Sequence, residues 1–180
     1  MKNKKLYSKI LYLVFIFFVG SLMGGVLEIL YQIINNGSFK IGGFMYGPFR
    51  PIYGWGCILL HLIGKNFNKN IFITFISSFI ICSVFEYLSS YVLELIFGHV
   101  WWNYSDFLIN INGRVCLFTS ICWGLLGIIF MSFLEPLLLK IYNKVNKENL
   151  LIILITIFIV YMIDSTLSII NHLNNYIIVK

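Results

Sequence analysis

The sequence predicts an all-α integral membrane protein, a bundle of about five transmembrane helices. Of its 180 residues, 59% are hydrophobic and only 11% are charged. A water-soluble domain carries about 25% charged residues, so this chain has too little polar surface to cover a soluble globule. Its apolar runs are continuous and long enough to cross a hydrocarbon core of about 30 Å, which takes roughly 20 helical residues. Because backbone polar groups in lipid must be satisfied internally, these runs predict helices.

We expect a single transmembrane domain over residues 1–180, with no soluble domain. The expected helices span residues 10–34, 48–64, 71–97, 115–139 and 150–170. The first follows a basic lead-in, as a signal peptide would. Its apolar stretch is too long for one, and Glu28 and Tyr31 do not resemble a small-residue cleavage site, so we interpret it as a retained helix.

The second helix is short and follows a segment rich in glycine and proline. Between residues 42 and 56 the segment contains Gly42, Gly43, Gly47, Pro48, Pro51, Gly54 and Gly56. Such a composition breaks regular structure, which predicts a broken or re-entrant segment before the second helix. Irregular backbone at membrane depth is tolerated only where it is buried in protein or lines a wet cavity.

The basic residues predict an orientation. With the N-terminus in the cytoplasm, nine of the 13 lysines and arginines fall on the inside: Lys2, Lys4, Lys5, Lys9, Lys65, Lys69, Lys140, Lys144 and Lys147. This bias is what the positive-inside rule expects, and it explains the net charge of +6 without nucleic acid as a partner. We therefore expect a multipass protein of the bacterial cytoplasmic (inner) membrane, with the lipid bilayer as its first partner.

The four cysteines indicate no metal site and no cofactor. Cys57, Cys82, Cys116 and Cys122 lie in or beside the expected helices, where a thiol behaves as a small apolar side chain. Their spacing matches no zinc pattern, and residues 116 and 122 are not neighbours on a helix, which disfavours a disulfide between them.

Ionisable residues inside the helices are the candidate site. A carboxyl group at a helix centre costs about 2.5 to 3.5 kcal/mol on insertion scales, so such groups usually face the bundle interior and have partners. Counted along the helices, the acids reach the outer half of the membrane, where two arginines flank the helix ends. The predicted polar cluster comprises Glu28, Arg50, Glu86, Glu94, Asp106, Arg114 and Asp164.

Two interpretations of this cluster stay open. The residues form ion pairs that lock the bundle, or they line an outward-facing polar cavity for an ion, a lipid headgroup or a small polar solute. Within the cluster we expect Arg114 to extend toward Glu86 and pair with it. We interpret Trp101, Trp102 and Tyr104 as interfacial anchors, and His61 as a hydrogen-bonded packing residue.

A family resemblance rests on four ordered motifs between about Gly20 and Phe130. They are the stretch 47–56, Glu86-Tyr87-Leu88 with Glu94, the stretch 101–106, and 112–116 followed by Trp123-Gly124. These motifs resemble the small bacterial membrane proteins called putative ABC-transporter type IV, or CmpB-like. The resemblance implies a multipass fold and a permease label, without a substrate or a catalytic residue. The sequence departs from the family pattern at Asn103, where an Asp is expected.

Three hypotheses for function follow. The first is a permease-like component of an ABC transporter, working as a homo-oligomer or with a separate ATPase or membrane subunit, because the sequence has no P-loop motif of its own. The second is an intramembrane enzyme acting on a lipid or lipid-linked substrate, with Glu86 as acid or base and Arg50 and Arg114 holding a phosphate. The third is a non-catalytic subunit that packs against a larger complex through Gly20, Gly24, Gly124 and Gly127.

Overall fold

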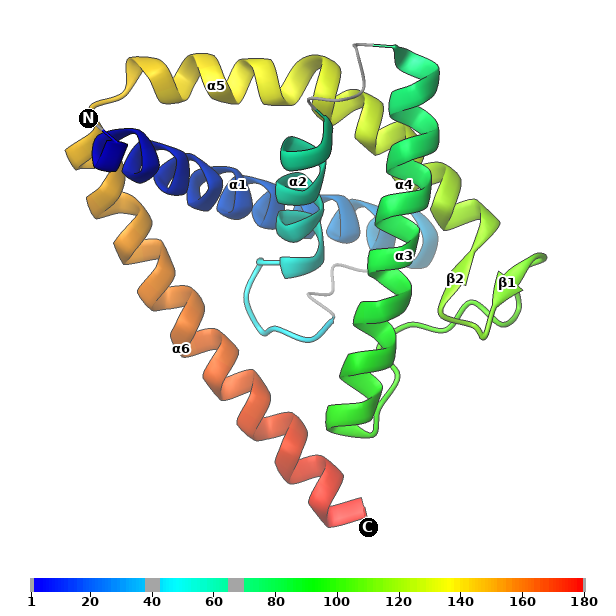
Figure 1. Ribbon diagram of the computed structural model, residues 1–180. Coiled ribbons are helices and arrows are strands. Elements are labelled where there is room, and N and C mark those ends of the chain that lie inside the picture. Colours follow the sequence, from blue (N-terminus) through cyan, green and yellow to red (C-terminus); the bar gives the residue numbers. More distant parts are fainter. Residues whose placement is uncertain (1, 38–42, 65–69, 180) are drawn as a thin grey trace. The chain divides into compact units, whose positions relative to one another are not determined.

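The computed structural model describes residues 2–37, 43–64 and 70–179, and these residues are almost entirely helical (Figure 1). The helices are α1 (Lys2–Asn36), α2 (Pro51–Gly64), α3 (Ile71–Phe97), α4 (Leu117–Ile129), the π-helical turn η1 (Phe130–Leu134), α5 (Glu135–Lys144) and α6 (Lys147–Val179). Two short antiparallel strands, β1 (Asn110–Ile111) and β2 (Val115–Cys116), lie between α3 and α4. The predicted fold class, an all-α membrane protein, is confirmed.

Among the described residues, four helical stretches are long and apolar enough to cross a membrane. They are Lys4–Ile34, Ile71–Phe97, Leu117–Lys144 and Lys147–Asn174. The 14 residues of α2 extend over only about 21 Å, which is shorter than a hydrocarbon core of about 30 Å. Residues 43–50 before α2 form no regular structure, as the glycines and prolines there predict. Gly42 of that predicted segment lies outside the described residues.

The helix expected to end near residue 139 continues to Lys144 and changes its pitch on the way. Its middle section, η1, is a π-helical turn in which the backbone N–H of Glu135 donates to the carbonyl of Phe130. Pro136 follows directly. Proline has no N–H to donate and its ring crowds the carbonyl four residues earlier, so a wider turn at this point lets the helix continue past it.

The described residues divide into two compact units. One lies within residues 1–58 and 138–171, and the other within residues 59–137 and 172–180. The expectation of a single transmembrane domain therefore stays a prediction. Each unit is described below by itself.

In the second unit, α3 is delimited by residues that suit its ends. The side chain of Asn70 accepts hydrogen bonds from the backbone N–H groups of Phe72 and Ile73, which have no partner inside the helix. Gly98 ends the helix with φ of 63°, a left-handed conformation that glycine adopts without strain.

The face that α3 buries is a ridge of polar and small side chains at every fourth position. Its members are Thr74, Ser78, Cys82, Glu86 and Ser90. Such an i±4 ridge is one of the rows by which helices pack, and here it faces α4. Ser83 donates a hydrogen bond to Ser120 across this interface at 2.7 Å.

Four glycines lie where two helices of this chain approach each other closely. Methyl groups added at Gly124 and Gly127 of α4 would meet Phe75 and Ser78 of α3. In the first unit, methyl groups at Gly20 and Gly24 of α1 would meet residues of α2, Cys57 and Tyr53. The hypothesis that these four glycines pack against another protein is therefore wrong, because neighbouring helices of this chain occupy them.

Candidate functional site

The candidate site is built around the α3–α4 loop, residues 99–116. Its strands β1 and β2 are joined by a turn in which Asn112 and Gly113 have φ of 53° and 66°. Positive φ at two successive residues is the combination used by type I′ turns, for which Asn-Gly is a preferred pair. The turn returns the chain toward α3, and the backbone N–H of Tyr104 donates to the carbonyl of Gly113 at 2.7 Å.

Three side chains connect the α3–α4 loop to itself and to α3. The indole N–H of Trp102 donates to the carbonyl of Arg114 at 3.0 Å. The hydroxyl of Tyr104 donates to Oε1 of Glu86 at 3.1 Å. The guanidinium of Arg114 donates to the hydroxyl of Ser90 at 3.2 Å and forms an ion pair with Glu94. The loop is thus tied to α3 at three successive turns of the helix.

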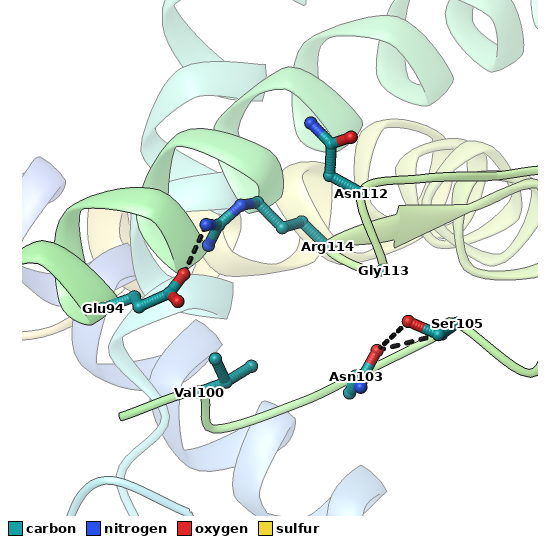
Figure 2. Close-up of a pocket in the computed structure, with 7 residues that line it drawn as sticks. All are labelled: Glu94, Val100, Asn103, Ser105, Asn112, Gly113 and Arg114. Carbon is teal, nitrogen blue, oxygen red and sulfur yellow. Dashed lines mark hydrogen bonds and ion pairs between the residues drawn. The ribbon is translucent and has the colours of Figure 1, made fainter. Parts of the chain in front are cut away.

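The α3–α4 loop and α3 border a small, open polar pocket of about 140 Å³ (Figure 2). Figure 2 shows the side chain of Arg114 reaching across to Glu94 on α3, with Asn103 and Ser105 on another, irregular segment of the loop. The pocket is lined by Glu94, Val100, Asn103, Ser105, Asn112, Gly113 and Arg114. Val100 is the one apolar side chain among these lining residues, so the pocket offers charge and hydrogen bonds rather than hydrophobic contact.

The predicted pairing of Arg114 with Glu86 is wrong. Arg114 pairs with Glu94 instead, because the turn at residues 112–113 sets its backbone near the end of α3. Glu94 is two turns closer to that end than Glu86. The arginine side chain is 16% exposed and that of Glu94 is 38% exposed, so the pair lies at the edge of the packed helices.

Glu86 lies deeper and has neutral partners. The residue is 4% exposed, and its two carboxyl oxygens accept from Tyr104 and from the indole N–H of Trp123 at 2.9 Å. Trp123 was not among the predicted site residues. Its position in the sequence, after Cys122 and before Gly124, does not indicate that it contacts Glu86. That contact depends on how α3 and α4 pack against each other.

A second polar cluster lies in the first unit. Arg50 is 5% exposed, and its Nε donates to Glu28 on α1 at 2.5 Å while its Nη1 donates to the carbonyls of Gly47 and Phe49 at 2.9 Å. The carboxylate of Asp164 on α6 accepts from the backbone N–H groups of Tyr46 and Gly47, at 3.2 and 3.0 Å. The irregular segment before α2 is therefore held by side chains from two helices.

The predicted cluster is thus divided between the two units. Glu28, Arg50 and Asp164 belong to the first, while Glu86, Glu94 and Arg114 belong to the second. Asp106, also in the second, is exposed on the α3–α4 loop. The convergence of all seven residues on one layer of the membrane stays a prediction.

The aromatic residues expected at the interface make specific contacts. Trp102 and Tyr104 donate the hydrogen bonds described above, and Trp101 packs edge-on against Phe97 and His172. These contacts lie within the second unit. Their role as interfacial anchors stays a prediction.

A further side-chain hydrogen bond joins Nδ1 of His61 on α2 to Glu135, the residue that follows η1. The prediction that His61 is hydrogen-bonded is confirmed. Glu135 was missed among the predicted residues, although an acid beside a proline within an apolar helix is itself a signal. Within the described residues, Cys82, Cys116 and Cys122 are not joined in disulfides. Within the described ranges no three His, Cys, Asp or Glu side chains are grouped so that they could hold a metal ion.

A family model described as "Putative ABC-transporter type IV" matches residues 15–169. The chain belongs to this family. The match includes α3, α4 and the whole α3–α4 loop, and it confirms the resemblance drawn from the motifs. Comparison with curated proteins and with solved structures gave no match.

Asn103 holds the local turn of the loop in this member of the putative ABC-transporter type IV family, and the expected departure from the family pattern at this position stays a prediction. Oδ1 of Asn103 accepts from the backbone N–H and the hydroxyl of Ser105, at 2.9 and 2.6 Å. A carboxylate oxygen of an Asp would accept the same two hydrogen bonds. An Asp at this position would therefore keep the local turn and add a negative charge to the pocket.

Proposed function

We propose that this protein is a permease-like membrane component of an ABC-type transporter, and that the pocket of the α3–α4 loop binds an ion or a small polar solute. Its membership of the family and its four long apolar helices support a role in membrane transport. The sequence carries no P-loop, so a separate ATPase subunit would supply ATP hydrolysis.

The pocket itself is the observation that carries the proposal. A volume of 140 Å³ is equivalent to about four or five water molecules and is smaller than the roughly 300 to 1,000 Å³ of sites for drug-sized ligands. Its lining combines a guanidinium, a carboxylate, two amides and a hydroxyl. Such a site suits a solute that both donates and accepts hydrogen bonds, or a small ion with its remaining water.

The charge distribution supports an orientation for this site. With the N-terminus in the cytoplasm, the α3–α4 loop lies on the outer side of the bacterial cytoplasmic membrane. A chain of four or five helices is too small to enclose a translocation path by itself. We therefore propose that it works as a homo-oligomer or beside a second membrane subunit.

Ligand-induced stabilisation tests the proposal. The melting temperature of the purified protein in nanodiscs would be measured against a panel of inorganic ions, amino acids, polyamines and small sugars. A ligand that occupies the pocket raises the melting temperature according to its free concentration and affinity. The pocket variant is Asn112→Gly, which removes the amide while tolerating the positive φ of this position, and the matched control is Asp106→Asn, at an exposed residue of the same loop.

A solute that stabilises the wild type and Asp106→Asn more than it stabilises Asn112→Gly is the expected result. Its transport by cells should then depend on this gene. A panel without a stabilising member, or equal stabilisation of Asn112→Gly, would contradict the proposal.

The enzyme hypothesis has less support. It needs Arg50 and Arg114 to hold a phosphate beside Glu86, yet these arginines pair with Glu28 and Glu94. The side chains that hydrogen-bond the carboxyl group of Glu86 are Trp123, Tyr104 and Thr119. The hydroxyl of Thr119 also donates to the carbonyl of Cys116, where it caps α4, which favours a positioning role over a nucleophile and base pair.

A further inference from the structure

We propose that Glu86 is a proton-binding site inside the membrane, and that Tyr104 transmits its charge state to the α3–α4 loop. This inference goes beyond the proposed function, because it concerns a proton rather than the solute and can be tested without any solute. It rests on the surroundings of Glu86 in the second unit.

Glu86 differs from the other acids of the helices in what faces it. Glu28 and Glu94 each pair with an arginine and Glu135 contacts His61, whereas no basic side chain pairs with Glu86 among the described residues. It is nevertheless 4% exposed and lies in the middle of α3. A buried charge without a counter-charge is costly, and the binding of a proton removes that charge without moving any helix.

The hydrogen bonds of Glu86 suit both of its charge states. Trp123 is only a donor, so its indole N–H holds Oε2 as an acceptor throughout. The hydroxyl of Tyr104, 3.1 Å from Oε1, is both a donor and an acceptor. When Glu86 is ionised, Tyr104 donates to Oε1. When a proton from water binds Oε1, the new O–H donates to the Tyr104 oxygen, so both contacts persist and only the one with Tyr104 reverses its direction.

A metal cation fits these surroundings less well than a proton does. Each carboxyl oxygen already has a donor hydrogen directed at it, from Tyr104 and from Trp123. The other titratable groups near Glu86 are the thiols of Cys82, one turn earlier on α3, and Cys122 on α4. Thiols and phenols are usually neutral at neutral pH, so they bring no charge that would hold a cation beside Glu86.

Tyr104 links this carboxyl group to the pocket. Its backbone N–H donates to the carbonyl of Gly113, and its neighbours in the chain are Asn103 and Ser105. Gly113, Asn103 and Ser105 all line the pocket. Hydrogen bonds to a charged acceptor are roughly twice as strong as neutral ones. An ionised Glu86 therefore holds the α3–α4 loop more firmly than a protonated one.

Hydrogen exchange of the full-length protein in nanodiscs tests the transmission. Backbone exchange of residues 99–113 would be measured at mildly acidic and mildly alkaline pH and corrected for the intrinsic pH dependence of exchange. We expect protection of the loop to rise about fivefold at the alkaline pH in the wild type, which corresponds to roughly 1 kcal/mol. Glu86→Gln should abolish this change, while Glu148→Gln, at an exposed acid in the first turn of α6, should retain it.

Tyr104→Phe separates proton binding from transmission, and it keeps the carboxyl group. Infrared difference spectra between the two pH values should show the carbonyl band of a protonated carboxylic acid in the wild type and in Tyr104→Phe. Trp123→Phe should shift this band, because the indole bonds directly to Oε2, and this assigns the band even if Glu86→Gln fails to fold. In Tyr104→Phe, the pH response of the loop should be lost.

Three results would overturn the inference. They are a wild-type loop with equal protection at both pH values, a pH response that persists in Tyr104→Phe, and a carboxylic acid band that Trp123→Phe leaves unchanged. None of them depends on solute binding. A failure here would therefore leave the ligand panel of the proposed function unaffected.

Discussion

The side chain of Arg114, at the end of the α3–α4 turn, reaches α3 and pairs with Glu94 while donating to the hydroxyl of Ser90. The backbone carbonyl of Arg114 also accepts from the indole N–H of Trp102. Arg114 therefore connects the turn to α3 and to the start of the α3–α4 loop. The pair forms one wall of the polar pocket. Loss of either partner should therefore affect both the fold and the site.

A double-mutant cycle measures this relationship. Arg114→Ala should lower the free energy of unfolding in detergent by about 1 to 3 kcal/mol, because it leaves Glu94 without its charged donor. The loss in Arg114→Ala/Glu94→Gln should be smaller than the sum of the single losses by at least about 0.5 kcal/mol. Glu86→Gln serves as the control partner. A coupling of Arg114 to Glu86 that equals or exceeds its coupling to Glu94 would refute the pairing.

The close approach of α3 and α4 predicts a size-dependent defect at Gly127. An added methyl group there would meet the side chain of Ser78, so Gly127→Ala should cost about 1 to 3 kcal/mol of stability. Ser78→Gly in the same molecule should restore part of this loss by vacating the space. Leu125→Ala, on the exposed side of α4, is the control for helix propensity. Failure of the second change to rescue the first would argue against this contact.

The sequence predicts the helices well because the signals for them are local. The apolar length of α3, with Asn70 before it and Gly98 after it, follows from residues adjacent in the chain. Asn112-Gly113 is also a local signal, and it could have predicted the turn that places Arg114. We expected Glu86 as the partner instead, because helix length alone says nothing about how the loop returns to α3.

The irregular segment before α2 predicts a further local effect. Asp164 accepts from the backbone N–H groups of Tyr46 and Gly47, and the hydroxyl of Ser168 accepts a further hydrogen bond from Tyr46 at 3.3 Å. Asp164→Ala should increase backbone exchange at these two residues by about 10- to 100-fold, the equivalent of roughly 1.4 to 2.7 kcal/mol. Asp106→Asn should leave their exchange at the wild-type rate. Unchanged exchange in Asp164→Ala would show that the segment is held by other contacts.

The His61–Glu135 pair predicts a contrast between single and double replacements. His61→Leu alone removes the partner of a mostly buried carboxyl group and should cost about 3 to 5 kcal/mol. His61→Leu/Glu135→Leu replaces the pair with apolar side chains and should recover most of that loss. The measurement is again the free energy of unfolding in detergent. A double variant as unstable as the single one would contradict the pairing.

Side-chain partners across helices could not be predicted from spacing. His61 and Glu135 are 74 residues apart, and Glu86 and Trp123 are 37 apart. Each pair depends on the rotation and depth of packed helices, which many side chains determine together. The sequence does show that carboxyl groups inside apolar helices need partners. Glu28, Glu86 and Glu94 all have one, although Arg114 pairs with Glu94 and not with Glu86 as expected.

The proposed function depends most directly on the α3–α4 loop facing the outside of the cell. Ser105→Cys places a thiol in the pocket, and Asn146→Cys places one between α5 and α6 on the expected cytoplasmic side. A membrane-impermeant maleimide applied to intact cells should label Ser105→Cys above the background of the native cysteines, and should label Asn146→Cys only after the membrane is opened. Labelling of Asn146→Cys in intact cells, with Ser105→Cys protected, would contradict the proposed orientation and the outward-facing site.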